Sequence, residues 1–298
     1  MQQSDLPATP RRFGFLRTRR GKVITTAAVF AALVGGGLVV APFASADEIG
    51  QAPSAQNITG AGNFRTTETR ISGQSGFGGG FVYTPNATGR FPVISVSPGF
   101  TARWSSIDWM GPRLASWGFV VVGIETNSTT DQPASRGRQL LAALDWAVND
   151  APSAVRAKVD GSRRGVAGHS MGGGGTLEAL KADTTGTVRA GVPVAPWDLD
   201  KTWDDVSEAV MIVGGQRDAI APVSTHSNRF FNTLAGPKAL VEIAGGSHFF
   251  PQQRNEPTTS RAMVSWFKSR LSDDGRFDEF TCGFNAAAGA SRFQSNQC

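Results

Sequence analysis

The sequence contains very few cysteines and histidines. Among its 298 residues there are two cysteines, Cys282 and Cys298, and three histidines, His169, His226 and His248. Any catalytic step that needs an imidazole must therefore use one of three positions. Both cysteines lie at the C-terminal end, where we expect a disulfide if the protein reaches an oxidising compartment; two free thiols are the alternative. Such a disulfide would contribute about 3 kcal/mol.

Phosphate-binding and repeat signatures are also absent. We find no internal repeat. The glycine-rich run at 76–80 precedes a strand-like segment instead of linking a strand to a helix, and it lacks the lysine of a P-loop. A flexible or bulged hairpin turn explains this run better.

The first 46 residues have the organisation of an export signal. A region with six basic residues is followed by an apolar run at 23–40 and by Ala44-Ser45-Ala46. This order is typical of a secretory signal cleaved after a small residue, so we expect cleavage after Ala46 and a secreted, extracellular protein. A membrane anchor is the alternative, because 18 apolar residues could just span a bilayer. The pair Arg11-Arg12 only loosely resembles a twin-arginine signal, which leaves the export route open.

The mature chain has no net charge. The whole sequence has 29 basic and 24 acidic residues, and residues 1–46 contain six of the basic ones and one of the acidic ones. Residues 47–298 therefore carry 23 of each. This balance gives no reason to expect binding to nucleic acid or, after signal cleavage, to an anionic membrane.

Strand-like and helix-like segments alternate along the mature chain. Residues 47–62 consist mostly of Ala, Gln, Pro, Ser and Gly, with little to bury, and predict a flexible N-terminal arm. The rest, 63–298, predicts a single catalytic domain with a mostly parallel central sheet and helices on both faces. The expected strands are 81–83, 91–97, 119–124, 164–168, 190–194, 209–213 and 240–243, and the expected helices are 107–117, 136–148, 171–181, 224–234 and 258–271.

The segment Gly168-His169-Ser170-Met171-Gly172 follows one of these strands and begins one of these helices. In a G-x-S-x-G elbow the serine occupies a strained turn, and glycines allow neighbouring backbones to approach it closely. The elbow therefore nominates Ser170 as a nucleophile, against the alternative of a plain glycine-rich turn. Ligands of parallel sheets bind at the carboxyl ends of strands, which is where this serine lies.

A serine nucleophile needs a base, and elimination favours His248. His169 should point away from the nucleophile and pack beneath the elbow, and His226 lies on an expected helix, where a structural or exposed role fits better. His248 follows the last expected strand, in a loop that can reach the serine. Of the acidic residues at strand ends, Asp218 follows its strand by one tight turn and completes the order Ser, Asp, His of α/β-hydrolases. The alternatives are four aspartates expected to be solvated: Asp198, Asp200, Asp204 and Asp205.

Together these motifs resemble a known family. The segments at 75–80, 97–100, 168–175, 196–203, 221–224 and 247–249 are similar to those of the actinobacterial cutinases, polyester hydrolases that include enzymes degrading poly(ethylene terephthalate). The resemblance covers nearly all of the mature chain and includes the paired C-terminal cysteines. It implies the α/β-hydrolase fold without a lid domain.

The resemblance also assigns roles to single positions. Ser170, Asp218 and His248 would be the triad, and the backbone amides of Phe100 and Met171 would form the oxyanion hole. Trp197 would be the aromatic wall of the acyl cleft, with Ile220 and Phe249 beside it. Two departures matter: many relatives have tyrosine at the position of Phe100, and several bind calcium through acids where this chain has Gln216 and Ala244. We therefore predict no metal site and no cofactor.

The predicted function is hydrolysis of the ester bonds of cutin, aliphatic polyesters or poly(ethylene terephthalate) by a monomeric enzyme. Only about 15 residues separate the strands ending at Val194 and beginning near Val210, too few for a helical cap. An open apolar cleft suits a polymer surface. The alternatives are a short-chain acylglycerol esterase and, in another class, a noncatalytic binding protein with a hydrolase fold.

Overall fold

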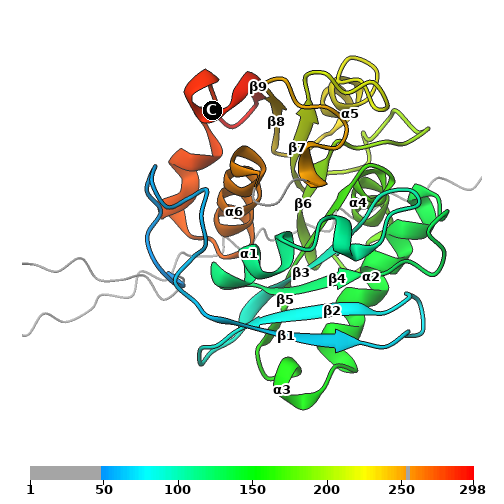
Figure 1. The fold of residues 1–298 in the computed structure, drawn as a ribbon, viewed down its shortest axis with the longest axis vertical. Helices are drawn as coiled ribbons and strands as arrows, with labels where there is room; N and C mark the ends of the chain where they lie inside the picture. Colours follow the sequence, from blue (N-terminus) through cyan, green and yellow to red (C-terminus); the bar gives the residue numbers. More distant parts are fainter. Residues whose placement is uncertain (1–47, 253–255) are drawn as a thin grey trace, which may run out of the picture. The chain divides into compact units, whose positions relative to one another are not determined.

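A single sheet organises the part of the chain that the computed structural model describes, residues 48–252 and 256–298. Its strand order is β1-β2-β4-β3-β5-β6-β7-β8-β9 (Figure 1). The strands are β1 (Thr66–Ile71), β2 (Gly80–Pro85), β3 (Phe91–Ser97), β4 (Val120–Ile124), β5 (Val159–His169), β6 (Val188–Val194), β7 (Ala209–Gly215), β8 (Lys238–Ile243) and β9 (Ala290–Ser295). The expected export signal lies outside the described residues and stays a prediction.

The six central strands, β4, β3, β5, β6, β7 and β8, pair in parallel. Apart from the polar first half of β5, their sequences are mostly apolar because both faces of the sheet are covered. In β7, Met211 and Val213 pack into one hydrophobic cluster, while Val210 and Ile212 pack into the other. This period of two places alternate side chains in two separate cores.

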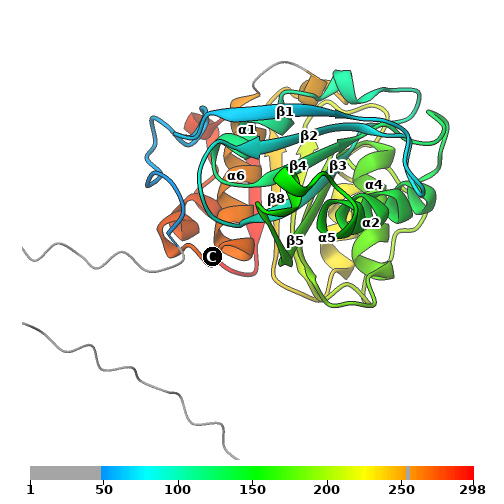
Figure 2. The same ribbon diagram turned by 90° about the horizontal axis from the view of Figure 1, so that it is seen from below.

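Helices cover both faces. They are α1 (Met110–Ser116), α2 (Pro133–Asn149), α3 (Ser153–Arg156), α4 (Met171–Ala182), α5 (Ser227–Thr233) and α6 (Pro257–Leu271), with 3-10 turns η1 (Trp104–Ser106), η2 (Phe250–Gln252), η3 (Gly275–Thr281) and η4 (Ala286–Ala288). Residues of α1 and α6 pack in one cluster, and residues of α2, α4 and α5 pack in the other. Figure 2 shows α6 and α2 on opposite sides of the strands. The predicted fold class, a mostly parallel sheet between helices, is confirmed.

The two edge strands, β1 and β9, and the short helix α3 were not expected from the sequence. β1 has four consecutive exposed residues, and β9 has no buried side chain after Ala290. Each pairs antiparallel with a single neighbour, so no hydrophobic run marks it in the sequence. The glycine-rich run at 76–80 lies between β1 and β2 and includes Gly76, Gly79 and Gly80 at positive φ, as a turn between antiparallel strands requires.

The N-terminal arm makes specific contacts, although its flexibility stays a prediction. Ile58 is buried in the core cluster of α1 and α6. The carbonyl of Gly60 accepts a hydrogen bond from the indole of Trp117, and the carbonyl of Ile49 accepts one from the buried amine of Lys268. The arm therefore packs against the domain more closely than its polar composition suggests: one apolar side chain enters the core, and backbone carbonyls accept hydrogen bonds from side chains of the domain.

Cys282 and Cys298 form the expected disulfide, 16 residues apart, with Cα atoms separated by 6.1 Å. It closes the segment that contains η4 and β9. Replacing both cysteines by serine should remove about 3 kcal/mol of stability, because the unfolded chain gains loop entropy. For a domain of this size that corresponds to a melting temperature lower by roughly 6 to 12 °C. Calorimetry would measure it, with the unmodified protein under reducing conditions as the control. Equal melting temperatures in oxidising buffer would contradict the prediction.

Candidate active site

Ser170 lies between the end of β5 and the first residue of α4 in a strained backbone conformation. Its φ is 58° and its ψ is −119°, which for a residue other than glycine costs on the order of 1–3 kcal/mol. A Cβ at Gly168 would lie 2.3 Å from the carbonyl oxygen of Gly172, and one at Gly172 would lie 2.3 Å from that of Ser97. Neither contact is possible, so both glycines of the motif are required by close backbone approach.

The structure brings Ser170, His248 and Asp218 into one chain of hydrogen bonds. His248 Nε2 lies 2.8 Å from Ser170 Oγ, and His248 Nδ1 lies 2.8 Å from Asp218 Oδ2. All three side chains are buried; Ser170 is 7% exposed. Because a carboxylate can only accept, Nδ1 donates to Asp218, which leaves the Nε2 lone pair to accept the serine proton.

Asp218 is held in its ionised form. Its Oδ1 accepts hydrogen bonds from the backbone amides of Ile220, at 2.8 Å, and Ala221, at 2.7 Å. Burial raises the pKa of Asp218, but the hydrogen bonds from His248 and from these amides outweigh it, and the pKa lies below its ordinary value. The carboxylate can therefore stabilise a positive charge on His248.

His169 contacts the loop that carries His248. It is buried under the elbow, as expected, and its Nε2 donates to the carbonyl oxygen of His248 at 2.9 Å. The two imidazole rings lie 5.0 Å apart. Burial, with the nearby His248, lowers the pKa of His169 to about 4, so this ring is neutral at pH 7. His169 thus fixes the backbone of His248 without adding a charge.

The two amides expected to form the oxyanion hole, those of Phe100 and Met171, are available as donors. Neither donates a hydrogen bond to a protein group among the described residues. Met171 is the first residue of α4, whose amide has no partner within the helix. Phe100 lies in the loop after β3, the strand next to β5.

Arg136 fixes the position of this loop, which the sequence analysis did not detect. It is fully buried in the first turn of α2. Its guanidinium donates to the carbonyl oxygens of Pro98, Thr129 and Asp131 at 3.0, 2.8 and 2.7 Å, and Thr129 accepts a further bond from the amide of Thr101. Burial lowers the pKa of Arg136 to about 10, and the side chain remains charged. From the sequence we expected the helix to begin at Arg136. Nothing in the sequence indicates that the side chain of a residue at a helix start binds the carbonyls of two loops.

Three exposed apolar residues follow site residues in the chain, and we call them the apolar rim: Phe100 follows Gly99, which packs against Ser170, while Ile220 and Phe249 follow Asp218 and His248. Phe100 is 46% exposed, Ile220 49% and Phe249 52%. The backbone amide of Trp197 donates to the carbonyl oxygen of Ser170 at 2.9 Å, which places Trp197 directly beside the elbow. Leu199, on the same loop, is 79% exposed and was not nominated from the sequence. These are the large apolar side chains that the described surface exposes most.

His226 packs against Trp197. The rings stack with centroids 6.3 Å apart and an angle of 30°, and Phe230 meets the His226 ring edge-on at 5.9 Å. Burial, then the charge of Lys201, lowers the pKa of His226 to about 4. Among the described residues no hydrogen bond joins His226 to Ser170 or Asp218; its Nδ1 lies 3.0 Å from Thr225 Oγ1.

Asp198 differs from the expectation for its loop. It was grouped with solvated aspartates, but it is buried, and one of its oxygens has no partner among the described residues. Burial raises its pKa to about 6. The loop folds Asp198 inward because its other oxygen accepts the amide of Asp200, 3.1 Å away.

Comparison with known proteins identifies the family of the chain. A family model described as PET hydrolase-like matches residues 41–298. The chain belongs to this family. It is 45% identical to a bis(hydroxyethyl) terephthalate hydrolase of Streptomyces coelicolor, over 89% of this chain and 87% of the relative. It is 46% identical to cutinase est2 of Thermobifida alba, over 74% of each chain, and 42% identical to cutinase cut1 of Thermobifida fusca, over 86% and 82%.

Family membership fixes the enzyme class: this PET hydrolase-like protein is a carboxylic ester hydrolase. No helix in the described ranges is both long and apolar enough to cross a membrane. Within the same ranges, no three acidic, histidine or cysteine side chains are grouped closely enough to hold a metal ion.

The two positions where the resemblance implies calcium ligands lie close together. Gln216, just after β7, accepts a hydrogen bond through Oε1 from the amide of Gly245, the residue after Ala244, at 2.8 Å. An amide oxygen and a methyl group in this place offer no carboxylate to a hard cation.

We expect little stabilisation by calcium in the unmodified protein and a clear effect after Gln216→Glu with Ala244→Asp. Two adjacent carboxylates favour Ca²⁺, and a ligand that binds only the folded state raises the melting temperature with concentration. The measurement is melting temperature against calcium concentration for both proteins, with magnesium as the control ion. A rise of several degrees in the unmodified protein at millimolar calcium would sink this prediction.

The buried neutral histidines predict a stability that falls in acid. The pKa of His226 is about 4 in the folded protein, against about 6.5 when unfolded, so the unfolded chain binds the extra proton between these values. Stability is fully present above about pH 6.5 and is lost as pH falls toward 4. Asp198, with its raised pKa, acts in the opposite direction over part of this range.

Replacing His226 by glutamine should therefore remove up to about 1.4 kcal/mol per pH unit of this dependence near pH 5. Denaturant unfolding at pH 5 and pH 7 for both proteins measures it. The same pH dependence in the variant and in the parent would show that His226 does not contribute.

Proposed function

We propose that this protein is a secreted serine esterase that hydrolyses polyester ester bonds through an acyl-enzyme intermediate. The observation that carries the proposal is the chain of hydrogen bonds from Ser170 through His248 to Asp218, recessed below an open apolar rim. The proposal of secretion depends on the signal-like sequence of residues 1–46. We propose further that the mature enzyme acts as a monomer without a cofactor.

In the acylation step, Ser170 Oγ attacks the ester carbonyl carbon while its proton passes to His248 Nε2. The carbonyl oxygen becomes an oxyanion, to which the amides of Phe100 and Met171 would donate. Asp218, ionised and held by two amides, stabilises the imidazolium. His248 then gives its proton to the leaving alcohol, and the acyl group stays on Ser170.

Deacylation repeats the sequence with water as the nucleophile. His248 Nε2 accepts a proton from the water, the hydroxide adds to the acyl carbon, and the C–O bond to Ser170 breaks. The serine recovers the proton from His248, and the free acid leaves. His248 can act in both directions because its Nε2 lies 2.8 Å from Ser170 Oγ while its Nδ1 donates to Asp218.

The preference for a polymer follows from the open site. β6 ends at Val194 and β7 begins at Ala209, and no helix lies in the described segment between them to cover the serine. Exposed Phe100, Ile220 and Phe249 can contact apolar acyl or aromatic units. The similarity to a bis(hydroxyethyl) terephthalate hydrolase and to cutinases supports such substrates.

A serine-directed phosphonate probe tests the mechanism. Ser170→Ala should abolish labelling and lower turnover by roughly 10⁴-fold or more, because the reaction then lacks its nucleophile. His248→Ala should lose labelling as well, whereas His226→Ala, a change at a buried histidine outside the hydrogen-bond chain, should keep most of it. Persistent labelling of Ser170→Ala, or a reversal of the two histidine variants in folded proteins, would overturn the assignment.

The substrate class is tested by product analysis on cutin, an aliphatic polyester, poly(ethylene terephthalate) and tributyrin under the same conditions. We expect release of soluble acids from at least one polymer, because no cap restricts access to Ser170. Phe249→Ala, which removes a rim ring and leaves the triad intact, should reduce polymer hydrolysis more than tributyrin hydrolysis. Activity on tributyrin alone would favour an acylglycerol esterase, and no activity with intact folding would favour a noncatalytic binding protein.

A further inference from the structure

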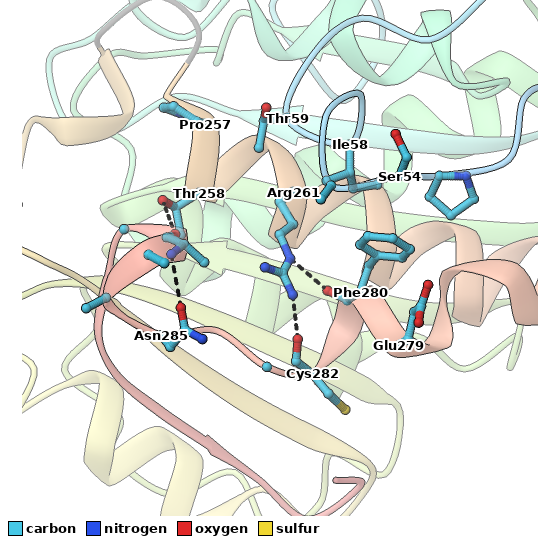
Figure 3. Close-up of a pocket in the computed structure, with 17 residues that line it drawn as sticks. Ser54, Ile58, Thr59, Pro257, Thr258, Arg261, Glu279, Phe280, Cys282 and Asn285 are labelled. Carbon is cyan, nitrogen blue, oxygen red and sulfur yellow. Dashed lines mark hydrogen bonds between the residues drawn. The ribbon is translucent and has the colours of Figure 1, made fainter.

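A cavity lies away from the proposed catalytic residues. It has a volume of about 1090 Å³ and opens between the N-terminal arm, the first turns of α6 and the C-terminal segment that contains η4 (Figure 3). None of Ser170, Asp218, His248 or the rim residues lines it. The proposed esterase mechanism therefore leaves this cavity without a role.

The walls of the cavity are largely apolar. The arm contributes Pro53 and the buried Ile58, η3 contributes Phe280, and η4 contributes three consecutive alanines, Ala286–Ala288. Small side chains and rings without charge favour an apolar body of modest size over a hydrated ion. Part of the alanine wall is exposed to solvent, which leaves room for entry.

One cation, Arg261, projects into the cavity from α6 (Figure 3). Its Nε donates to the carbonyl oxygen of Phe280 at 3.2 Å, and its Nη2 donates to that of Cys282 at 2.5 Å. The guanidinium carbon lies 4.2 Å from the centre of the Phe284 ring and 5.9 Å from that of Phe280. These contacts hold the guanidinium rigidly and leave Nη1 without a protein acceptor among the described residues.

No carboxylate in the described chain pairs with Arg261. Glu279 also lines the cavity but is exposed, and no ion pair joins it to the guanidinium. The carboxylate of Glu256 is occupied as the cap of α6, where it accepts the amides of Thr258 and Thr259. Among the described residues Arg261 therefore has no counter-ion, and its Nη1 has no acceptor. Burial also lowers the pKa of Arg261, while leaving it charged.

We propose that this cavity is a binding site for an apolar carboxylate, with the carboxylate on Arg261 and the hydrocarbon or aromatic body against the alanine and proline walls. Arginine binds carboxylates through paired, charge-assisted hydrogen bonds. Acids of this class are what ester hydrolysis releases, so the link to the reaction product rests on the proposed function. The binding of an apolar carboxylate in this cavity does not depend on the proposed function.

The experiment uses the full mature chain carrying Ser170→Ala, so that no ester is turned over. Octanoate and the mono(hydroxyethyl) ester of terephthalic acid are titrated while NMR follows the Arg261 Nε–H group and the amides of residues 283–289. A saturable shift with either acid supports the site. Tighter binding of the aromatic monoester would indicate a polyester product as the ligand, and tighter binding of octanoate would indicate a fatty acid. Neutral octanol and inorganic phosphate should not shift these signals to saturation. Saturation by phosphate with the same affinity would overturn the apolar part of the proposal.

Three variants separate binding from folding. Arg261→Gln should weaken acid binding at least tenfold, because the charge is lost. Ala287→Glu should also weaken acid binding while keeping Arg261 and its carbonyl contacts, because the new carboxylate at the cavity wall competes with the ligand for the guanidinium. Arg270→Gln, on the same helix but outside the cavity, is the matched control and should bind like the parent.

Unchanged affinity in both Arg261→Gln and Ala287→Glu would overturn the proposal, since binding would then depend neither on the charge of Arg261 nor on the alanine wall. Absence of any shift in the parent would overturn it as well. Neither result touches the serine assignment, which is decided by phosphonate labelling of the protein with Ser170 intact.

Discussion

The strained turn at Ser170 is the constraint on which the site depends. It can form only where β5 ends in the middle of a parallel sheet and α4 begins at once, with glycines where the backbones of residues 97, 168 and 172 nearly touch. This places the serine between the loop after β3 and the loop after β6. One neighbouring loop then supplies the amide of Phe100, and the other supplies Trp197. The strain at one residue is offset by the packing of the whole sheet around it.

A second principle recurs in the structure, both at this site and away from it: buried or partly buried donors hold the carbonyls of loops. His169 holds the carbonyl of His248, and Arg136 holds those of Pro98 and Thr129. Lys268 binds the carbonyl of Ile49, and Arg261 binds those of Phe280 and Cys282. A loop has no partner strand, so its carbonyls need such donors when they are buried. Arg136 and Arg261 differ in one respect, because all three donor nitrogens of Arg136 are used and one of Arg261 is not.

Predictions from the sequence succeeded where a local pattern has only one physical cause. Continuous apolar runs predicted the central strands because both faces of a parallel sheet are buried. The sequence did not reveal β1 and β9, because their exposed faces carry polar residues. It also led us to expect a solvated Asp198, because this residue lies in a polar segment, yet its side chain is buried. The contacts of Arg136 were missed for the same reason: an arginine near a helix end looks solvated until the loops around it are placed.

The sequence by itself determined the fold class, the turn at Ser170 and the chain order Ser, Asp, His, since each depends on spacing along the chain and on the conformations that glycine permits. Only the tertiary structure decided that Asp218 and His248 lie within 2.8 Å of their partners, that His226 stacks on Trp197, and that a cavity forms around Arg261. These contacts join residues from separate loops, 30 and 78 positions apart in the case of His248. Their distances are set by how strands and helices pack, and no short segment of sequence encodes that packing.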